Sequence, residues 1–366
     1  MMKKVFSAVV AAAILSIGLL AGCAGTGQNA SSSSAQQPAG EKVKVVCATF
    51  PAYDWARAVV GDEADRFEID YLMGSGVDLH SYQPSVQDIA KISDADLFVY
   101  VGGESDGWAE DAVKNAKPGL HALSMLDAVG DAVVEEEVVE GMQADEHEHG
   151  DAEGAEEGHD HEADEHGHGD AEEADAHEAH EHGDAEEPEH DEHVWLSLKN
   201  AKTVVDAMAG ELAKIDAEHA DAYAANAKAY DAKLVELDGK FDKAVKSGAK
   251  DTVVFADRFP FRYLVDDYGL NYYAAFVGCS AETEASFETV AFLAKKVDEL
   301  GLSSVFTIEN SDQEIAKTVI ENTEGKNQQI LVMDSLQSVK DSDVEAGKTY
   351  LSAMEENLDV LTKGLA

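Results

Sequence analysis

The chain has 366 residues, of which 74 are Asp or Glu and 27 are Lys or Arg, so its formal net charge is -47 at pH 7. This charge argues against nucleic acid as a partner, because nucleic-acid phosphates are bound by Lys and Arg, and it favours cations. The length is sufficient for two medium-sized α/β lobes after the non-globular segments are set aside.

The N-terminus is organised as a secretion signal. A short basic region precedes an apolar run from Val5 to Leu20, which is short for a membrane span. The run ends in Leu20-Ala21-Gly22-Cys23, which resembles the bacterial lipoprotein box, in which the Cys becomes the first mature residue and carries the lipid. We predict a signal peptide over 1–22, a flexible spacer over 23–41, and a lipid on Cys23 that holds the protein at the extracytoplasmic face of the cell membrane. The alternative is an ordinary signal peptide.

The next segment alternates between strand and helix patterns. Alternation of this kind predicts a parallel sheet in an N-terminal lobe over 42–197. We expect strands at Val43–Cys47, Phe67–Leu72 and Leu97–Val101, and helices at 50–60, 86–92 and 106–115.

A tract rich in His, Asp and Glu interrupts this lobe over 143–190. It has almost no large apolar side chains, so it cannot bury enough surface to offset the entropy of ordering, and we expect a disordered loop. Imidazole and carboxylate groups at this density indicate attraction of divalent metal ions. The alternative is an acidic solubilising linker.

The remainder of the chain predicts long connecting helices and a second lobe. We expect two long helices within 198–248, broken near residues 216–218, as a stiff connection, followed by a C-terminal lobe over 249–366. The expected strands are 252–256, 272–277, 304–308 and 329–333, and the expected helices are 261–268, 286–300, 312–322 and 344–361. The fold class is therefore α/β, with two βα lobes, parallel sheets and a cleft between the lobes.

Five polar residues follow strands or lie on the loops that leave them. They are His80, His193, Asp257, Glu309 and Asp334. Because ligands collect at the carboxyl ends of parallel strands, these side chains are candidate metal ligands. Each taken singly has an ordinary structural explanation, since an acid after a strand often caps a helix.

Three of these residues lie in longer motifs, which are Gly76-Val77-Asp78-Leu79-His80-Ser81-Tyr82-Gln83-Pro84, Asp191-Glu192-His193-Val194-Trp195 and Val332-Met333-Asp334-Ser335-Leu336. These motifs resemble those of the zinc- and manganese-binding lipoproteins of ABC transporters. The resemblance covers the chain from about Val43 to its C-terminus. It implies two lobes joined by a long rigid helix, one metal ion in the cleft, and His80, His193 and Asp334 as direct ligands.

The third ligand departs from the pattern of that family. Zinc-binding members place a His, and manganese-binding members a Glu, where this chain has Arg258, a cation that cannot coordinate metal. Asp257 is the nearest acceptor, and Arg258 is alternatively a clamp on a ligating carboxylate. Cys279 is a soft metal ligand, a disulfide partner of Cys47, or a buried thiol.

These observations predict a lipid-anchored, monomeric receptor that captures Zn²⁺ and delivers it to an ABC permease and its ATPase. A manganese receptor of the same type is one alternative, and a surface metal buffer or adhesin is another. We do not expect an enzyme, because the sequence contains no H-E-x-x-H motif and no evident Ser/His/Asp or Cys/His constellation.

Overall fold

The computed structural model describes residues 42–143, 189–280 and 284–366. The predicted signal peptide, the spacer with Cys23, and nearly all of the predicted loop over 143–190 lie outside these residues. Within the described part of the chain, no helix is both long and apolar enough to cross a membrane.

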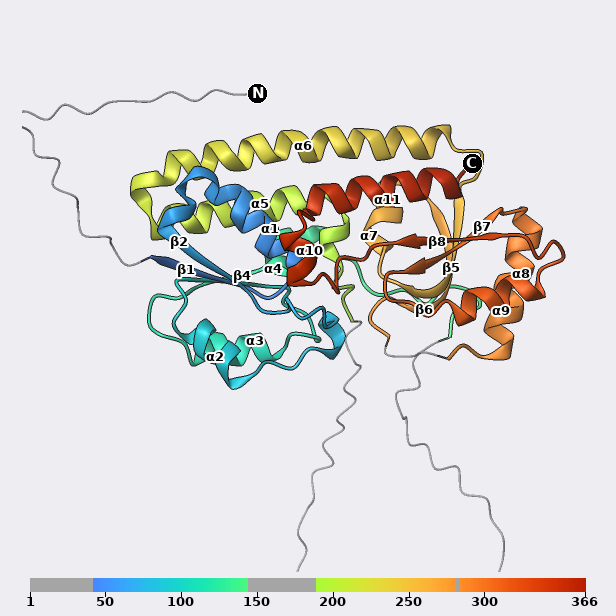
Figure 1. Cartoon of the computed structure of the whole chain (residues 1–366), viewed down its shortest axis with the longest axis horizontal. Coiled ribbons are helices and arrows are strands. Elements are labelled where there is room, and N and C mark those ends of the chain that lie inside the picture. Colours follow the sequence, from blue (N-terminus) through green and yellow to red (C-terminus); the bar gives the residue numbers. More distant parts are fainter. Residues whose placement is uncertain (1–41, 144–188, 281–283) are drawn as a thin grey trace, which may run out of the picture. The chain divides into compact units, whose positions relative to one another are not determined.

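The N-terminal lobe is built on a four-stranded parallel sheet (Figure 1). Its strands are β1 (Val43–Cys47), β2 (Phe67–Tyr71), β3 (Leu97–Tyr100) and β4 (His121–Ser124), in the order β2-β1-β3-β4. The central strand β1 pairs with both neighbours, and its last three residues are buried. Such short, apolar, β-branched runs are typical of strands that are covered on both faces.

The C-terminal lobe repeats this plan with a second parallel sheet. Its strands are β5 (Thr252–Phe259), β6 (Asn271–Val277), β7 (Ser304–Ile308) and β8 (Gln329–Met333), in the order β6-β5-β7-β8. The prediction of two α/β lobes with parallel sheets is therefore confirmed. The β5–β6 pairing shifts register between Phe255 and Arg258, near the carboxyl end of β5.

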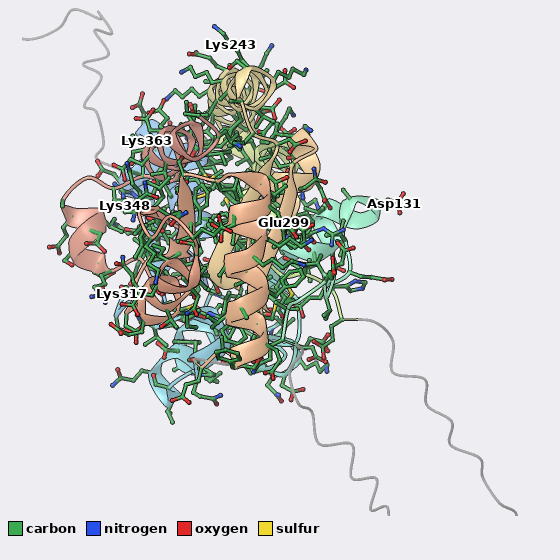
Figure 2. The ribbon with its side chains drawn as sticks, turned by 90° about the vertical axis from the view of Figure 1, so that its right-hand side faces the viewer. Asp131, Lys243, Glu299, Lys317, Lys348 and Lys363 are labelled. Atoms are coloured by element: carbon green, nitrogen blue, oxygen red, sulfur yellow. The ribbon has the colours of Figure 1, made fainter. Side chains whose placement is uncertain are left out.

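Helices cover both sheets and connect them. They are α1 (Phe50–Val60), α2 (Val86–Ser93), α3 (Trp108–Lys114), α4 (Met125–Val129), α5 (Leu198–Ile215), α6 (Ala220–Ser247), α7 (Arg262–Tyr268), α8 (Phe287–Leu300), α9 (Glu314–Asn322), α10 (Asp341–Glu345) and α11 (Tyr350–Gly364). The 28-residue α6 packs against α1 and α5 of the N-terminal lobe and leads into β5, and α11 lies beside it (Figure 1). Charged side chains such as Lys243, Glu299 and Lys363 project outward from these helices (Figure 2).

Three elements differ from the sequence-based expectation, and one of them is the five-residue helix α4, which was not predicted. Strand β4 was not predicted, because its sequence His-Ala-Leu-Ser offers only one large apolar residue. The helix expected over 344–361 is divided into α10 and α11. Gly347 has a φ of 99°, which ends the first helix, and Thr349 caps the second by accepting the N–H of Ser352.

The lobes are joined by a buried aromatic cluster of Trp55, Trp195 and Tyr350. The rings of Trp55 and Tyr350 lie 5.0 Å apart, and the Tyr350 hydroxyl donates to the Trp195 carbonyl at 2.6 Å. The Trp195 indole N–H in turn donates to the Ser335 carbonyl at 2.9 Å. Since Trp195 is two residues after His193, this cluster fixes the segment that carries a predicted ligand.

The segment that follows the last strand and helix of the N-terminal sheet reaches across to the C-terminal lobe. The Gln143 N–H donates to the Ala275 carbonyl on β6, and Glu135 pairs with His190 in an antiparallel bridge. The start of the predicted loop over 143–190 is thus held at β6, and its end is held at the strand-like segment of Glu135.

The aromatic cluster generates a stability prediction. Tyr350→Phe removes the hydroxyl that donates to the Trp195 carbonyl, and we expect the free energy of unfolding to fall by about 1–2 kcal/mol, because a buried acceptor loses its donor. Urea denaturation measures the change. The control is Thr362→Val on the exposed side of α11, where the loss is expected to stay below about 0.5 kcal/mol. Equal losses in the two variants would contradict the prediction.

Candidate metal centre

The two predicted His ligands are presented by the same local turn. In Asp78-Leu79-His80 and in Asp191-Glu192-His193, the Asp carboxylate accepts the backbone N–H of the His two residues later, at 3.0 Å and 2.8 Å. Asp side chains favour such turns because they hydrogen-bond their own backbone two residues on. Each Asp therefore fixes the backbone from which its His side chain projects.

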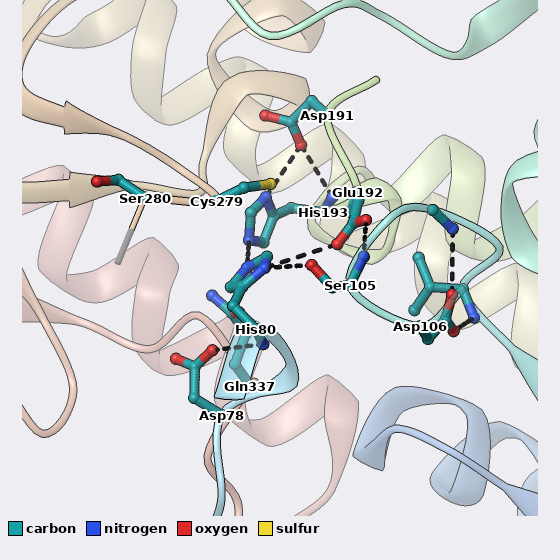
Figure 3. A network of polar contacts seen from close by, with 12 residues as sticks. Asp78, His80, Ser105, Asp106, Asp191, Glu192, His193, Cys279, Ser280 and Gln337 are labelled. Carbon is teal, nitrogen blue, oxygen red and sulfur yellow. Dashed lines mark hydrogen bonds and ion pairs between the residues drawn. The ribbon is translucent and has the colours of Figure 1, made fainter. Parts of the chain in front are cut away.

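The imidazole rings converge through their Nε2 atoms, which lie 3.1 Å apart (Figure 3). The Nδ1 of His193 donates to Asp191 at 3.0 Å, and the Nδ1 of His80 lies 2.6 Å from the Ser105 hydroxyl. The Nδ1 of His80 is also 3.6 Å from the buried carboxylate of Glu192. Partners of this kind on the second ring nitrogen orient metal-binding His residues and leave Nε2 as the ligand atom.

The loop of Ser105 is itself held by a carboxylate. Asp106 accepts the backbone N–H groups of Val101, Gly102 and Gly103 at 2.7, 2.9 and 3.1 Å. The Ser105 N–H donates to Glu192 at 2.8 Å, which links this loop to the segment of His193 (Figure 3). The His80 ring is therefore held by both the Ser105 hydroxyl and the Glu192 carboxylate.

Cys279 offers a candidate third ligand atom from the C-terminal lobe. Its sulfur and one nitrogen from each of His80 and His193 all lie within 4.8 Å of one another. Cys279 follows β6 and the closely packed Gly278, where an added Cβ would lie only 2.9 Å from the His193 ring. Among the described residues, this is the one group of three or more His, Cys, Asp or Glu side chains with such a spacing.

The donor set suits a tetrahedral divalent ion. Zinc–nitrogen bonds of about 2.0–2.1 Å place two tetrahedral nitrogen ligands roughly 3.3 Å apart, close to the separation of the two Nε2 atoms. Imidazole and thiolate are both common zinc ligands. The cluster can thus hold zinc through two nitrogens and one sulfur with small adjustments.

Protonation of the cluster responds to burial and to neighbouring charge. Burial and the charge of His193 lower the pKa of His80 to about 3. Burial opposes a charge on His193, but Asp191 outweighs it and the pKa of His193 is raised. Burial, followed by the charges of Glu136 and Asp191, raises the pKa of the Cys279 thiol well above its usual range. Binding of a metal ion to this sulfur must therefore release a proton.

The three predicted carboxylate ligands lie outside this cluster. Asp334 forms an ion pair with Lys348 and accepts the N–H of Leu336 at 2.8 Å, so it makes the same kind of turn as Asp78 and Asp191 without presenting a His. Glu309 accepts both the N–H and the hydroxyl of Ser335.

Burial and the charge of Asp334 raise the pKa of Glu309 to about 7. Asp257 accepts the N–H of Arg258 at 2.9 Å. The assignment of all three acids as ligands stays a prediction.

A cavity of about 470 Å³ lies beside His80, between the lobes. It is lined from the N-terminal lobe by Asp78 and His80, and from the C-terminal lobe by Arg258, Ser280 and Glu309. Cys47 and Cys279 are both free thiols, so the disulfide alternative is not realised.

Some residues of the site were not predicted as functional. Asp191 could have been identified because it repeats the Asp-x-His spacing of Asp78 and His80. Ser105 and Glu136 carry no such signal, since they reach the site only through the fold. The Glu136 carboxylate accepts the N–H of Cys279 at 3.0 Å.

Comparisons with known proteins find zinc-binding relatives of this chain. A family model described as "Zinc-uptake complex component A periplasmic" matches residues 45–364. The "Zinc-binding protein AdcA" of Streptococcus pyogenes serotype M3 is 30% identical over 326 residues, which cover 87% of this chain and 55% of that protein. The chain thus spans about half the length of this relative.

Two further matches extend over nearly the full length of the compared protein. The "High-affinity zinc uptake system protein ZnuA" of Bacillus subtilis is 30% identical over 357 residues, 98% of this chain and 96% of the relative. The solved structure of the Zn(II)-bound ZnuA-like domain of Streptococcus pneumoniae AdcA is 25% identical, with a TM-score of 0.62, and the match covers 88% of this chain and 99% of that domain.

Coordination by sulfur can be tested with Co²⁺, which gives intense thiolate-to-metal charge-transfer absorption. We expect this absorption when Co²⁺ is added to the reduced protein, because Cys279 lies beside both imidazoles. Cys279→Ser should lose it, whereas Cys47→Ala, which alters a buried thiol outside the cluster, should retain it. Absorption that survives in Cys279→Ser would exclude this sulfur as a ligand.

Proposed function

The chain belongs to the family of zinc-uptake complex component A proteins, and on this premise we propose that it captures Zn²⁺ and delivers it to an ABC permease and its ATPase. We further propose that it works as a monomer at the extracytoplasmic face of the membrane, held there by a lipid on Cys23.

The observation that carries this proposal is the convergence of His80 and His193. Their Nε2 atoms lie 3.1 Å apart, and the other nitrogen of each ring already has a partner. The 3.1 Å separation fits a hydrogen bond between the two rings in the absence of metal, and it equally fits two nitrogens that bind one ion. A shared metal ion explains why both rings point at one position.

Cys279 favours zinc over manganese as the captured ion. Thiolate is a soft ligand that suits zinc, whereas Mn²⁺ prefers carboxylate, carbonyl and water. A ligand set of two imidazoles and one sulfur departs from the carboxylate-rich set that would suit manganese. Zinc is therefore the proposed ion, with manganese as the weaker competitor.

The distribution of the ligands over the fold suggests how the ion is released. His80 belongs to the N-terminal lobe, Cys279 follows β6 of the C-terminal lobe, and His193 lies on the segment between them. Separation of the lobes would pull His80 away from Cys279 and weaken the site. A permease that favours the separated state would thereby receive the ion.

Zinc titration of the metal-stripped protein tests the proposal. We expect one saturable site of micromolar or tighter affinity by calorimetry, and we expect His80→Ala to weaken it at least a hundredfold, because one of the clustered ligands is removed. His121→Ala is the matched control, since His121 pairs with Glu211 away from the cluster. Absence of a tight one-to-one site in the wild type would refute the proposal.

A second variant separates this site from the His-rich tract. Replacing residues 144–188 by a short Gly/Ser linker should keep the tight site, because its clustered ligands lie outside that segment. A surface metal buffer would instead lose all zinc binding. Calorimetry of the linker variant distinguishes the receptor from the buffer.

Competition between ions tests the preference for zinc. We expect Mn²⁺ to displace Zn²⁺ only at an excess of a hundredfold or more, because the sulfur ligand and the Irving–Williams order both favour zinc. Cys279→Asp should narrow this preference by exchanging sulfur for oxygen. Displacement of zinc by equimolar Mn²⁺ from the wild type would reverse the assignment.

A further inference from the structure

We propose that Arg258 is a positioning residue that ties the loop of His80 to the loop of Cys279 and slows the release of zinc. This inference rests on the proposed capture of zinc. It assigns a task to the residue that stands where related zinc-binding proteins are expected to place a third His.

The guanidinium group of Arg258 contacts both ligand loops at once. Its Nη2 donates to the Asp78 carboxylate at 2.7 Å, and its Nη1 donates to the Ser280 carbonyl at 3.3 Å. Asp78 lies two residues before His80, and Ser280 is the residue after Cys279. One side chain of the C-terminal lobe therefore fixes the spacing of two ligands from different lobes.

Asp78 connects this clamp to the ligand itself. One of its carboxylate oxygens accepts the backbone N–H of His80 at 3.0 Å, and the other accepts from Arg258. The carboxylate thus holds the His80 turn and the C-terminal lobe at the same time. Asp78 and Arg258 are largely shielded, with 18% and 19% of their side chains exposed, so solvent weakens the ion pair less than it would at an open surface.

The backbone of β5 directs Arg258 toward the cleft. The strand shifts register between Phe255 and Arg258, and the Asp257 carboxylate accepts the Arg258 N–H at 2.9 Å. Irregularities of this kind re-aim a side chain at the end of a strand. As a result Arg258 lines the cavity between the lobes, together with Asp78 and Ser280.

The chemistry of guanidinium explains why Arg, and not Lys, occupies this position. Its planar fork can donate to a carboxylate and a carbonyl in fixed directions, whereas a Lys ammonium is a single flexible point of charge. The positive charge would repel a nearby metal ion if it were unpaired. Pairing with Asp78 offsets that charge, so the clamp can lie beside a cation site.

The consequence concerns the rate of metal release. If the lobes must separate for zinc to leave, both contacts of Arg258 have to break in the same step. Removal of a residue that orients metal ligands typically weakens metal affinity about 10- to 100-fold. The effect should therefore fall mainly on the dissociation rate, because the three ligand side chains themselves are unchanged.

The experiment measures zinc release from the full-length chain by stopped flow, with a chromogenic chelator as the acceptor. We expect Arg258→Ala to release zinc at least tenfold faster than the wild type. Arg258→Lys should give an intermediate rate, because Lys keeps a charge for Asp78 without the second contact. The matched control is Arg66→Ala, which removes another Arg–Asp pair, with Asp216, that touches neither ligand loop.

A double-mutant cycle tests the pair directly. Asp78→Asn keeps an oxygen that can accept the His80 N–H but removes the charge that Arg258 binds. We expect it to accelerate release, and we expect the double variant to be no faster than Arg258→Ala, because the two residues act through one contact. If Arg258→Ala does not fold, as judged by its thermal melt, Arg258→Lys and Asp78→Asn carry the test.

The outcomes separate this inference from the proposed function. If the wild type binds zinc tightly and the variants release it at rates within twofold of the wild-type rate, the proposed role of Arg258 is wrong and the proposed capture of zinc still holds. Equal acceleration by Arg66→Ala also overturns the proposed role of Arg258, because the effect would then be a general loss of stability. A wild type without a tight zinc site overturns both proposals.

Discussion

The contact between His193 and Asp191 is the constraint on which the site depends. His193 is fully buried, and Asp191 holds both its backbone N–H and its imidazole Nδ1. Burying a polar ring nitrogen without a hydrogen-bond partner costs free energy, and Asp191 provides that partner for Nδ1. Tyr263 in turn donates to the Asp191 carbonyl at 2.7 Å, which ties this segment to the C-terminal lobe. The His193 ring therefore cannot rotate freely, and the other two candidate ligands lie beside it.

The other two candidate ligands, His80 and Cys279, lie on segments that belong to different lobes. The His80 turn is supported by Ser105 and Asp78, and the Cys279 loop by Glu136. The supports of His80 bind its backbone N–H and its Nδ1, so they orient the ring without engaging Nε2. A site assembled in this way is preorganised on each side of the cleft but remains sensitive to the separation of the lobes. That combination suits a protein that must bind an ion and then release it.

The sequence predicts the architecture more completely than the site. Apolar strands such as Val43–Cys47 and Ser304–Ile308 were expected at their observed bounds, because burial on both faces leaves a strong local pattern. His80 and His193 were also expected, and the structure brings their ring nitrogens together. Asp334 illustrates the limit, because the sequence does not show which groups its carboxylate contacts. Only the fold shows that its carboxylate meets Lys348.

Arg258 and Cys279 lie near the ends of neighbouring strands, and together they bear on which residue of the C-terminal lobe is the third ligand. In the pattern that the chain resembles, the end of the first strand of the second lobe supplies a ligand, whereas here it supplies a cation. The Cys279 thiol is a candidate for this ligand role, because it follows the neighbouring strand β6, which pairs with β5 in parallel and so ends at the same edge of the sheet. Adjacent parallel strands present their carboxyl ends to one place, so a ligand can move from one strand to the next without moving the metal. Arg258 in turn holds the loop of Cys279 through the Ser280 carbonyl.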